Sequence, residues 1–165
     1  MIEMTWYRIG VDPGLSGAVA VLDDTGDLAL LSDLPTLAAG KGAKISRRLD
    51  PAGLARLLEP YRGKVTLALV EQVAARPGQG VASVFSLGDS FGTIRAVLAC
   101  LAVPVRLVPP AEWKRAYRLD SDKERARAKA IELFPSADLH RKADHNRAEA
   151  LLMARFALSV SRPQH

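Results

Sequence analysis

The stretch RIGVDPGLSGAVAVLD, Arg8–Asp23, has the pattern of a β-hairpin. It contains two apolar segments with strand-like composition, joined by a short Pro-Gly-Leu connection, and so predicts two neighbouring strands. The first segment ends in Asp12, a carboxylate at the mouth of the expected core. The simplest explanation is a turn residue, because Asp is common in turns. The alternative is that Asp12 performs chemistry at the end of the first strand.

The rest of the chain alternates strand and helix patterns around this hairpin. A third strand follows after a Thr-Gly turn, and residues 64–73 are apolar on both faces, which is typical of a central, covered strand. Asp50 and Pro51 favour the start of a helix, and Ser121 with Glu124 three residues later predicts a capping box. The predicted strands cover residues 5–12, 16–24, 27–34, 64–73 and 103–110, and the predicted helices cover 50–61, 81–102, 111–118, 121–134 and 145–160.

This order predicts one α/β domain over residues 1–165. Its five-stranded mixed sheet consists of a three-strand meander and two strands reached by helical crossovers, with helices flanking it. The first strand and residues 64–73 are expected to be neighbours near the middle. Residues 38–48 contain Gly and several charges, and are expected to form an exposed loop.

Composition narrows the class of protein. The single Cys100 excludes an intrachain disulfide and favours a reducing compartment. We find no signal peptide and no apolar run of the ~20 residues that a membrane span needs, so a cytoplasmic protein is expected. The net charge is +5, and residues 114–129 hold 7 basic and 3 acidic residues, a net +4. This basic segment favours a polyanionic partner, although a solvated helix face with mixed charges has the same composition.

Two acids should meet at one edge of the sheet. Glu71 ends the central strand in phase with Val65, Leu67 and Leu69, so its side chain should point where they point. Carboxyl ends of strands in an open α/β sheet are where ligands bind, which brings Asp12 and Glu71 together. Two desolvated carboxylates repel each other, and a divalent cation offsets that repulsion. Oxygen ligands suit Mg²⁺ or Mn²⁺.

A third acid follows in the last predicted helix. Glu149 shares a helical face with Leu152, Met153 and Phe156, so it should also face inward. His145 lies one turn earlier on that face, and Asp144 lies just before the helix. Asp144 has an alternative role as an N-cap, and His145 an alternative role as a polar residue at a helix start.

The ordered motifs resemble a known family. The stretches IGVDPGLSGAVAVLD, LVEQV, VFSLGDSFGTIRAVL, VPVRLVPPAEWKRA, SDKERA and DHNRAEALLMA occur in the same order as in RuvC-type Holliday-junction resolvases, across about Arg8 to Leu158. The chain is most similar to the compact members found in phage and prophage genomes. The resemblance implies a ribonuclease H-like fold, a homodimer, and a crossover junction endodeoxyribonuclease. Such an enzyme uses Mg²⁺ (or Mn²⁺), with two ions in each active site, to nick paired strands of a four-way DNA junction.

The resemblance also implies roles for individual residues. Asp12 and Glu71 match the first two metal-binding acids, and Glu149 matches the last. The family places another acid, or a His, three residues before the last one, where this chain has Asn146. Asp144 and His145 therefore both stay candidates for the fourth ligand. The four expected catalytic acids are Asp12, Glu71, Asp144 and Glu149.

Basic side chains are expected to bind the DNA backbone. The resemblance places Lys114, Arg115 and Lys123 at DNA-contacting positions, and Arg76 lies in the loop after Glu71. Two other functions stay open: a nuclease for forks or flaps, and a catalytically silent junction-binding module. The sequence GDSFG, residues 88–92, also fits the nucleophile elbow of esterases, but it lies inside a helical pattern.

Overall fold

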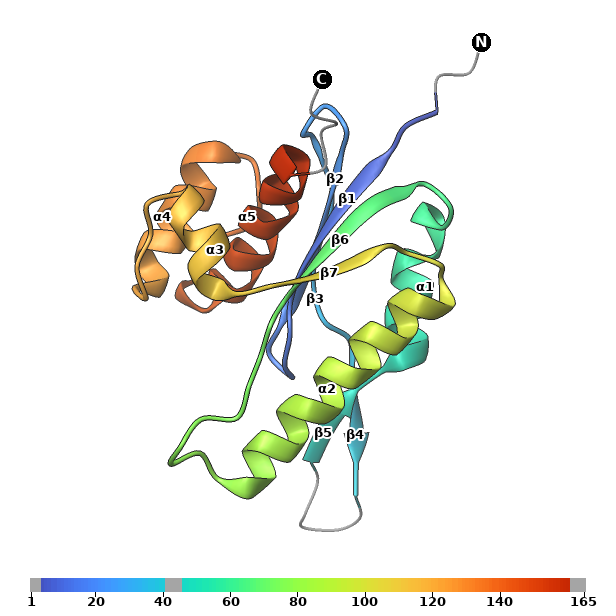
Figure 1. Ribbon diagram of the computed structural model, residues 1–165, viewed down its shortest axis with the longest axis vertical. Helices are drawn as coiled ribbons and strands as arrows, with labels where there is room; N and C mark the ends of the chain where they lie inside the picture. The colour runs from blue at the N-terminus through green and yellow to red at the C-terminus, as the bar shows by residue number, and fades with distance from the viewer. Residues whose placement is uncertain (1–3, 41–45, 161–165) are drawn as a thin grey trace.

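A five-stranded mixed sheet forms the centre of the protein. The computed structural model describes residues 4–40 and 46–160. The strand order is β3-β2-β1-β6-β7, with β1 antiparallel to β2 and parallel to β6 (Figure 1). The strands are β1 (Tyr7–Asp12), β2 (Ala18–Asp23), β3 (Leu28–Asp33), β6 (Val65–Glu71) and β7 (Val105–Val108). The predicted meander with two crossover strands is confirmed.

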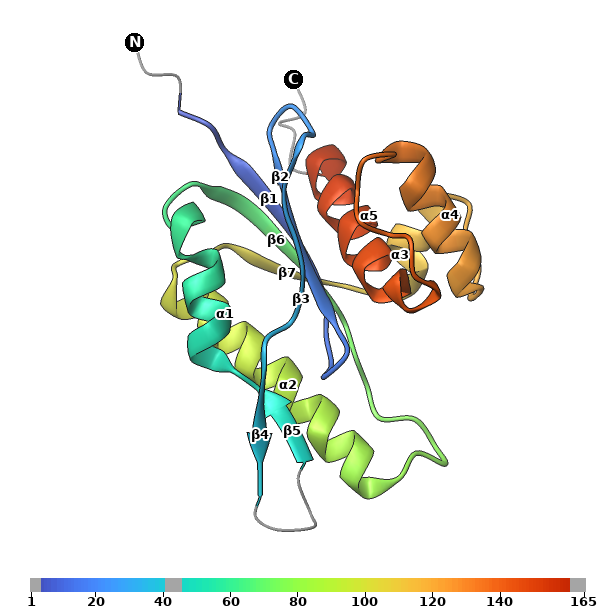
Figure 2. The same cartoon turned by 180° about the vertical axis from the view of Figure 1, so that it is seen from behind.

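Helices cover both faces of this sheet. One face carries α1 (Pro51–Leu58) and α2 (Val81–Cys100), and the other carries α3 (Pro110–Ala116), α4 (Lys123–Leu133) and α5 (His145–Val160) (Figures 1 and 2). Two short 3₁₀ turns, η1 (Glu59–Tyr61) and η2 (Lys142–Asp144), precede β6 and α5. The buried apolar residues accordingly form two clusters, one on each side of the sheet.

Successive side chains of β1 point to opposite faces of the sheet, and the two faces pack against different helices. Ile9 and Val11 point into the cluster under α1 and α2. Gly10 points the opposite way, where an added Cβ would lie only 2.1 Å from the Ala150 carbonyl oxygen. Glycine at this position therefore lets the backbone of α5 press directly against β1. Asp12 has the phase of Gly10, so it faces α5 as well.

Two local predictions are corrected. The segment expected as a loop contains a second, two-stranded sheet, in which β4 (Thr36–Ala39) pairs with β5 (Ser46–Leu49); residues 41–45 lie outside the described residues. The cap of α4 is Asp122, whose side chain accepts a hydrogen bond from the Glu124 amide at 2.9 Å, rather than Ser121. Both errors arose because composition and spacing do not show which backbone group a side chain or strand will meet.

The long helix α2 is half packed and half exposed. Ile94 and Leu98 are buried against the sheet, whereas Val81 is 87% exposed and Phe85 is 77% exposed. By length and composition alone α2 could cross a membrane, and within the described residues it is the one helix of that kind. That is weak support for a span, because a core helix of a soluble protein has the same properties. Ser90 is buried inside this helix, so GDSFG does not form the strand–turn–helix of an esterase elbow.

Candidate functional site

Three carboxylates from three elements line one cleft. Asp12 ends β1, Glu71 ends β6, and Glu149 lies in the second turn of α5. The cleft has a volume of about 430 Å³. Asp12 is 8% exposed and Glu149 is 5% exposed, so both acids lie in its depth. Their convergence follows from the fold, because Val11 of β1 pairs with Val70 of β6 and α5 packs across both strands.

The acids oppose one another electrostatically. Burial raises the pKa of Asp12 well above its usual range, and the charges of Glu149 and Glu71 raise it further. Burial also raises the pKa of Glu71, against a hydrogen bond from Trp113 that lowers it. The folded protein without a bound cation therefore holds these carboxylates at a cost in free energy.

Neighbouring residues of α3 hold two of the acids. The Trp113 indole Nε1 donates a hydrogen bond to Glu71 Oε2 at 2.8 Å. The Lys114 Nζ lies 3.1 Å from Glu149 Oε1 in a largely buried ion pair. Sequence analysis placed Lys114 on the DNA and did not identify Trp113. The sequence offered one indication for Trp113: if it is buried, its indole N–H needs a hydrogen-bond acceptor nearby.

A divalent cation suits the chemistry of the cleft. Its donor set is made of carboxylate oxygens, which Mg²⁺ and Mn²⁺ prefer. Across residues 4–40 and 46–160, no three Asp, Glu, His or Cys side chains already form a cluster that could hold a metal ion. One of the three acids, Glu149, is instead paired with the Lys114 ammonium. The donor set fits a divalent cation once the ion pair between Lys114 and Glu149 opens.

The structure does not bring Asp144 or His145 into this cleft. Asp144 lies in η2 and accepts three hydrogen bonds from Arg141, through the backbone N and through Nε and Nη2 of the guanidinium. Burial works to raise the pKa of Asp144, but these contacts with Arg141 hold it below its usual range. His145 Nδ1 lies 3.3 Å from the Lys142 carbonyl oxygen. Both side chains are thus used locally, at the start of α5.

Asn146 occupies the position in the cleft that Asp144 and His145 were expected to supply. It lies three residues before Glu149, on the same face of α5, and lines the cleft. Its amide nitrogen donates to the Ser16 carbonyl oxygen, which ties α5 to the turn after Asp12. At this position on α5 the cleft is thus lined by a neutral amide.

Basic side chains surround the acids. Arg76, Lys114 and Lys123 all line the cleft, reaching it from the loop after β6, from α3 and from the start of α4. Arg115, the fourth expected DNA contact, instead lines a separate hollow with Pro109 and Glu112. Acids in the depth of a cleft would suit a divalent cation, and the basic side chains beside them would suit a phosphate group.

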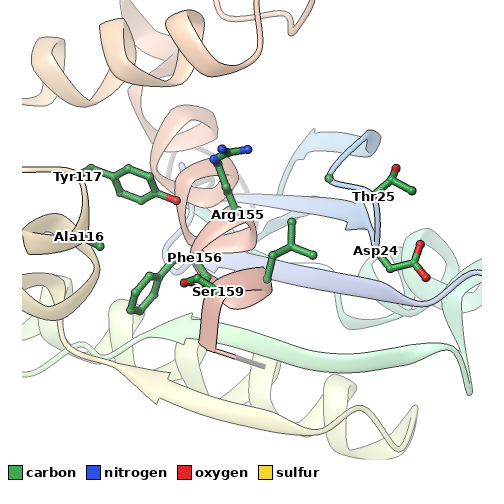
Figure 3. A pocket seen from close by; sticks show the side chains of 9 residues that line it. Asp24, Thr25, Ala116, Tyr117, Arg155, Phe156 and Ser159 are labelled. Atoms are coloured by element: carbon green, nitrogen blue, oxygen red, sulfur yellow. Dashed lines mark hydrogen bonds between the residues drawn. The ribbon is translucent and has the colours of Figure 1, made fainter. Parts of the chain in front are cut away.

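A larger hollow lies elsewhere. It has a volume of about 590 Å³ and contains Tyr117, Arg155 and Phe156, beside the β2–β3 turn (Figure 3). The Tyr117 hydroxyl donates to the Leu152 carbonyl, and burial raises the pKa of Tyr117 to about 12. None of the three site acids lines this hollow. The candidate site is therefore identified by its side chains and not by the volume of its cleft.

Comparison with known proteins identifies the fold. No protein-family model and no curated protein sequence matches the chain. Among solved structures, RuvC of T. thermophilus in complex with a Holliday junction substrate matches with a TM-score of 0.61, 15% identity, and 90% of each chain covered. A second structure of Thermus thermophilus RuvC matches with a TM-score of 0.53, 19% identity, and 90% of each chain covered. The protein therefore has the fold of RuvC, a ribonuclease H-like fold, over nearly its whole length.

Proposed function

We propose that this protein is a divalent-metal-dependent endonuclease that resolves four-way DNA junctions. The observation that carries the proposal is the convergence of Asp12, Glu71 and Glu149 in one cleft rimmed by cations, within a RuvC fold. A junction-binding module without catalysis would have no use for three mutually repelling carboxylates, two of them buried. A nuclease for forks or flaps would have the same site, and only a comparison of DNA substrates distinguishes it from a junction resolvase.

Each side chain has a defined task in the proposed reaction. Asp12, Glu71 and Glu149 would hold the cation or cations. Bound Mg²⁺ or Mn²⁺ supplies Lewis acidity and lowers the pKa of a coordinated water. Arg76 and Lys123 would bind and orient the DNA phosphates at the rim. Lys114 neutralises Glu149 before loading and, once released, is close enough to the same cleft to bind a phosphate.

The direct test compares DNA substrates. A four-way junction and a linear duplex of equal length are incubated with the protein, with and without Mg²⁺, and the products are sized at nucleotide resolution. We expect paired nicks at symmetrical positions in the junction, only with Mg²⁺. Equal cutting of the duplex would remove junction selectivity, and preferential cutting of a fork or flap would favour the second candidate. Binding without cutting under any divalent cation would indicate the silent module.

Lys123 provides a prediction about DNA affinity. Lys123→Ala is expected to weaken junction binding for all sequences and to reduce the slope of log K against log salt by about one, because one phosphate contact is lost. Lys129→Ala is the matched control, since Lys129 lies on the same helix but is paired with Glu132 and does not line the cleft. Titrations monitored by fluorescence anisotropy at several salt concentrations measure both slopes. Equal slopes for the two variants would contradict the assignment.

The exposed face of α2 is the proposed dimer surface. Val81 and Phe85 are exposed there, and a Cβ added at Gly88 or Gly92 would meet no atom within 4 Å. A second copy of α2 could pack closely against such a face, which would bury apolar area and place two active sites in one particle. Two sites are what paired nicking of a symmetrical junction requires.

Phe85→Asp is expected to convert a dimer into a monomer, because a desolvated carboxylate would replace the largest exposed apolar side chain of that face. Sedimentation equilibrium of the wild type and the variant measures the change in mass. Ile131→Asp on α4, 37% exposed, is the control and should leave the mass unchanged. A monomeric wild type at every accessible concentration would refute the surface.

A further inference from the structure

The contact between Trp113 and Glu71 has features that a purely structural tryptophan would not need. Trp113 is 0% exposed, and its indole Nε1 donates to Glu71 Oε2 at 2.8 Å. The ring also packs in the cluster between the sheet and α5. A Phe would supply most of this apolar volume without a polar atom that needs a partner. The choice of Trp therefore places a hydrogen-bond donor on a carboxylate of the cleft.

The chain path makes this contact rigid. Val108 of β7 pairs with Glu71 of β6, and the Gln72 amide donates to the Val108 carbonyl at 2.9 Å. Pro109 and Pro110 then start α3, which returns Trp113 to the same glutamate. Strand pairing fixes the backbone of Glu71, and the indole fixes its side chain.

The two contacts of α3 differ in how they respond to a cation. The Lys114 ammonium carries a full positive charge and competes with any cation for Glu149. The Trp113 indole is neutral, so it can keep its hydrogen bond while Glu71 Oε1 binds a cation. Outer partners of this kind orient metal-ligating carboxylates, and their loss weakens metal affinity. The Trp113 hydrogen bond therefore adds no charge that opposes the cation, whereas the Lys114 ammonium repels it.

We propose that Trp113 is a positioning residue for the metal site: its indole N–H anchors Glu71 Oε2 and presents Oε1 to a divalent cation in the cleft. This inference rests on the proposed function, because it assumes that Glu71 binds the cation. It adds a residue to the site whose effect is exerted through Glu71 and not through contact with the DNA or the metal.

The first test measures metal binding without DNA. Mn²⁺ is titrated into the protein by calorimetry, for the wild type, for Trp113→Phe and for Phe134→Leu. Trp113→Phe keeps an aromatic ring but loses the donor, and is expected to weaken Mn²⁺ binding by about 10- to 100-fold. Phe134→Leu removes volume from the same cluster without contacting an acid, and should leave Mn²⁺ affinity within about twofold of the wild type. In cleavage assays, the Trp113→Phe defect should be largely recovered at saturating Mn²⁺, because positioning affects metal affinity more than the chemical step.

A second measurement keeps Trp113 in place, in case Trp113→Phe does not fold. The chain has two tryptophans, so Trp6→Phe leaves Trp113 as the only indole emitter. Its fluorescence should change with Mn²⁺ and reach half of its full change at the Kd found by calorimetry, because the indole contacts a ligand of the metal. Failure of the wild type to bind Mn²⁺ would overturn the proposed function itself. Wild-type binding with unchanged Trp113 emission, or unchanged affinity in Trp113→Phe, would overturn the role of Trp113 alone.

Discussion

Asp12→Asn is expected to abolish metal-dependent cleavage, to preserve junction binding and to raise the thermal stability of the metal-free protein. The amide removes a charged ligand from the proposed metal site, and a loss of about 4 kcal/mol in transition-state stabilisation would slow cleavage roughly a thousandfold. The rim cations Arg76 and Lys123 are untouched, so the DNA contacts should persist. Single-turnover cleavage and anisotropy binding on the same junction measure both effects.

The stability gain follows from the direction of the Asp12 pKa. Burial, with the charges of Glu149 and Glu71, raises the pKa of Asp12 in the folded state. The folded protein therefore binds the proton more tightly than the unfolded chain does, and this group destabilises folding as pH rises above the unfolded pKa of Asp. Asn stays neutral, so the variant should melt higher than the wild type at pH 7 without metal, and the difference should shrink at acidic pH. Mg²⁺ should raise the Tm of the wild type and not that of the variant.

Asp144→Asn is the matched control, with the opposite sign. Asp144 is held by Arg141, and that contact lowers its pKa despite burial, so its charge stabilises the fold at pH values above the unfolded pKa of Asp. This stability is lost as pH falls through the folded pKa. Asp144→Asn should therefore melt lower than the wild type at pH 7 while keeping its cleavage rate. If Asp144→Asn lost as much cleavage activity as Asp12→Asn, Asp144 would have to be counted among the metal-binding residues.

Gly10→Ala is expected to destabilise the fold strongly. An added Cβ would lie 2.1 Å from the Ala150 carbonyl oxygen and 2.4 Å from the Ala154 amide nitrogen. Both atoms belong to helix backbone, which cannot rotate away as a flexible side chain can. We expect the free energy of unfolding to fall by at least about 3 kcal/mol and the Tm to fall by roughly 10 °C.

The same change should affect the site. Gly10 and Asp12 share one face of β1, and the close approach of α5 at Gly10 brings Glu149 toward Asp12. Displacing α5 should therefore weaken Mn²⁺ binding even in the molecules that remain folded. Gly80→Ala is the control, since its added Cβ meets no atom closer than 3.9 Å and the change from Gly to Ala at the N-cap of α2 should cost no more than about 1 kcal/mol. Thermal melts and Mn²⁺ calorimetry compare the two variants, and similar stabilities would contradict the packing argument.

The parts of the fold that follow from local patterns could be predicted from the sequence. Alternation in β1 and β6 places Asp12 and Glu71 at strand ends on one face, and 3.6-residue periodicity in α5 turns Glu149 inward. The meander, the crossovers and the three acids were accessible because each depends on a period or a short turn. The exception is Val65, which packs in the cluster under α1 and α2 and not with Leu67 and Leu69, because the register of β6 against β1 shifts at Tyr7 and Arg8.

Side chains that meet across long separations could not be paired from local patterns. Trp113 reaches Glu71 from 42 positions away, Lys114 pairs with Glu149, and Asn146 rather than Asp144 or His145 enters the cleft. These contacts depend on how α3 packs against the sheet and on the η2 turn, in which Asp144 is hydrogen-bonded to Arg141. The position of Asp12 at the end of a strand, with acids nearby, could be inferred from local patterns, since periodicity is a property of neighbouring residues. The partners of those acids had to be decided by packing, because a hydrogen bond or ion pair forms only when separate elements come within about 3 Å.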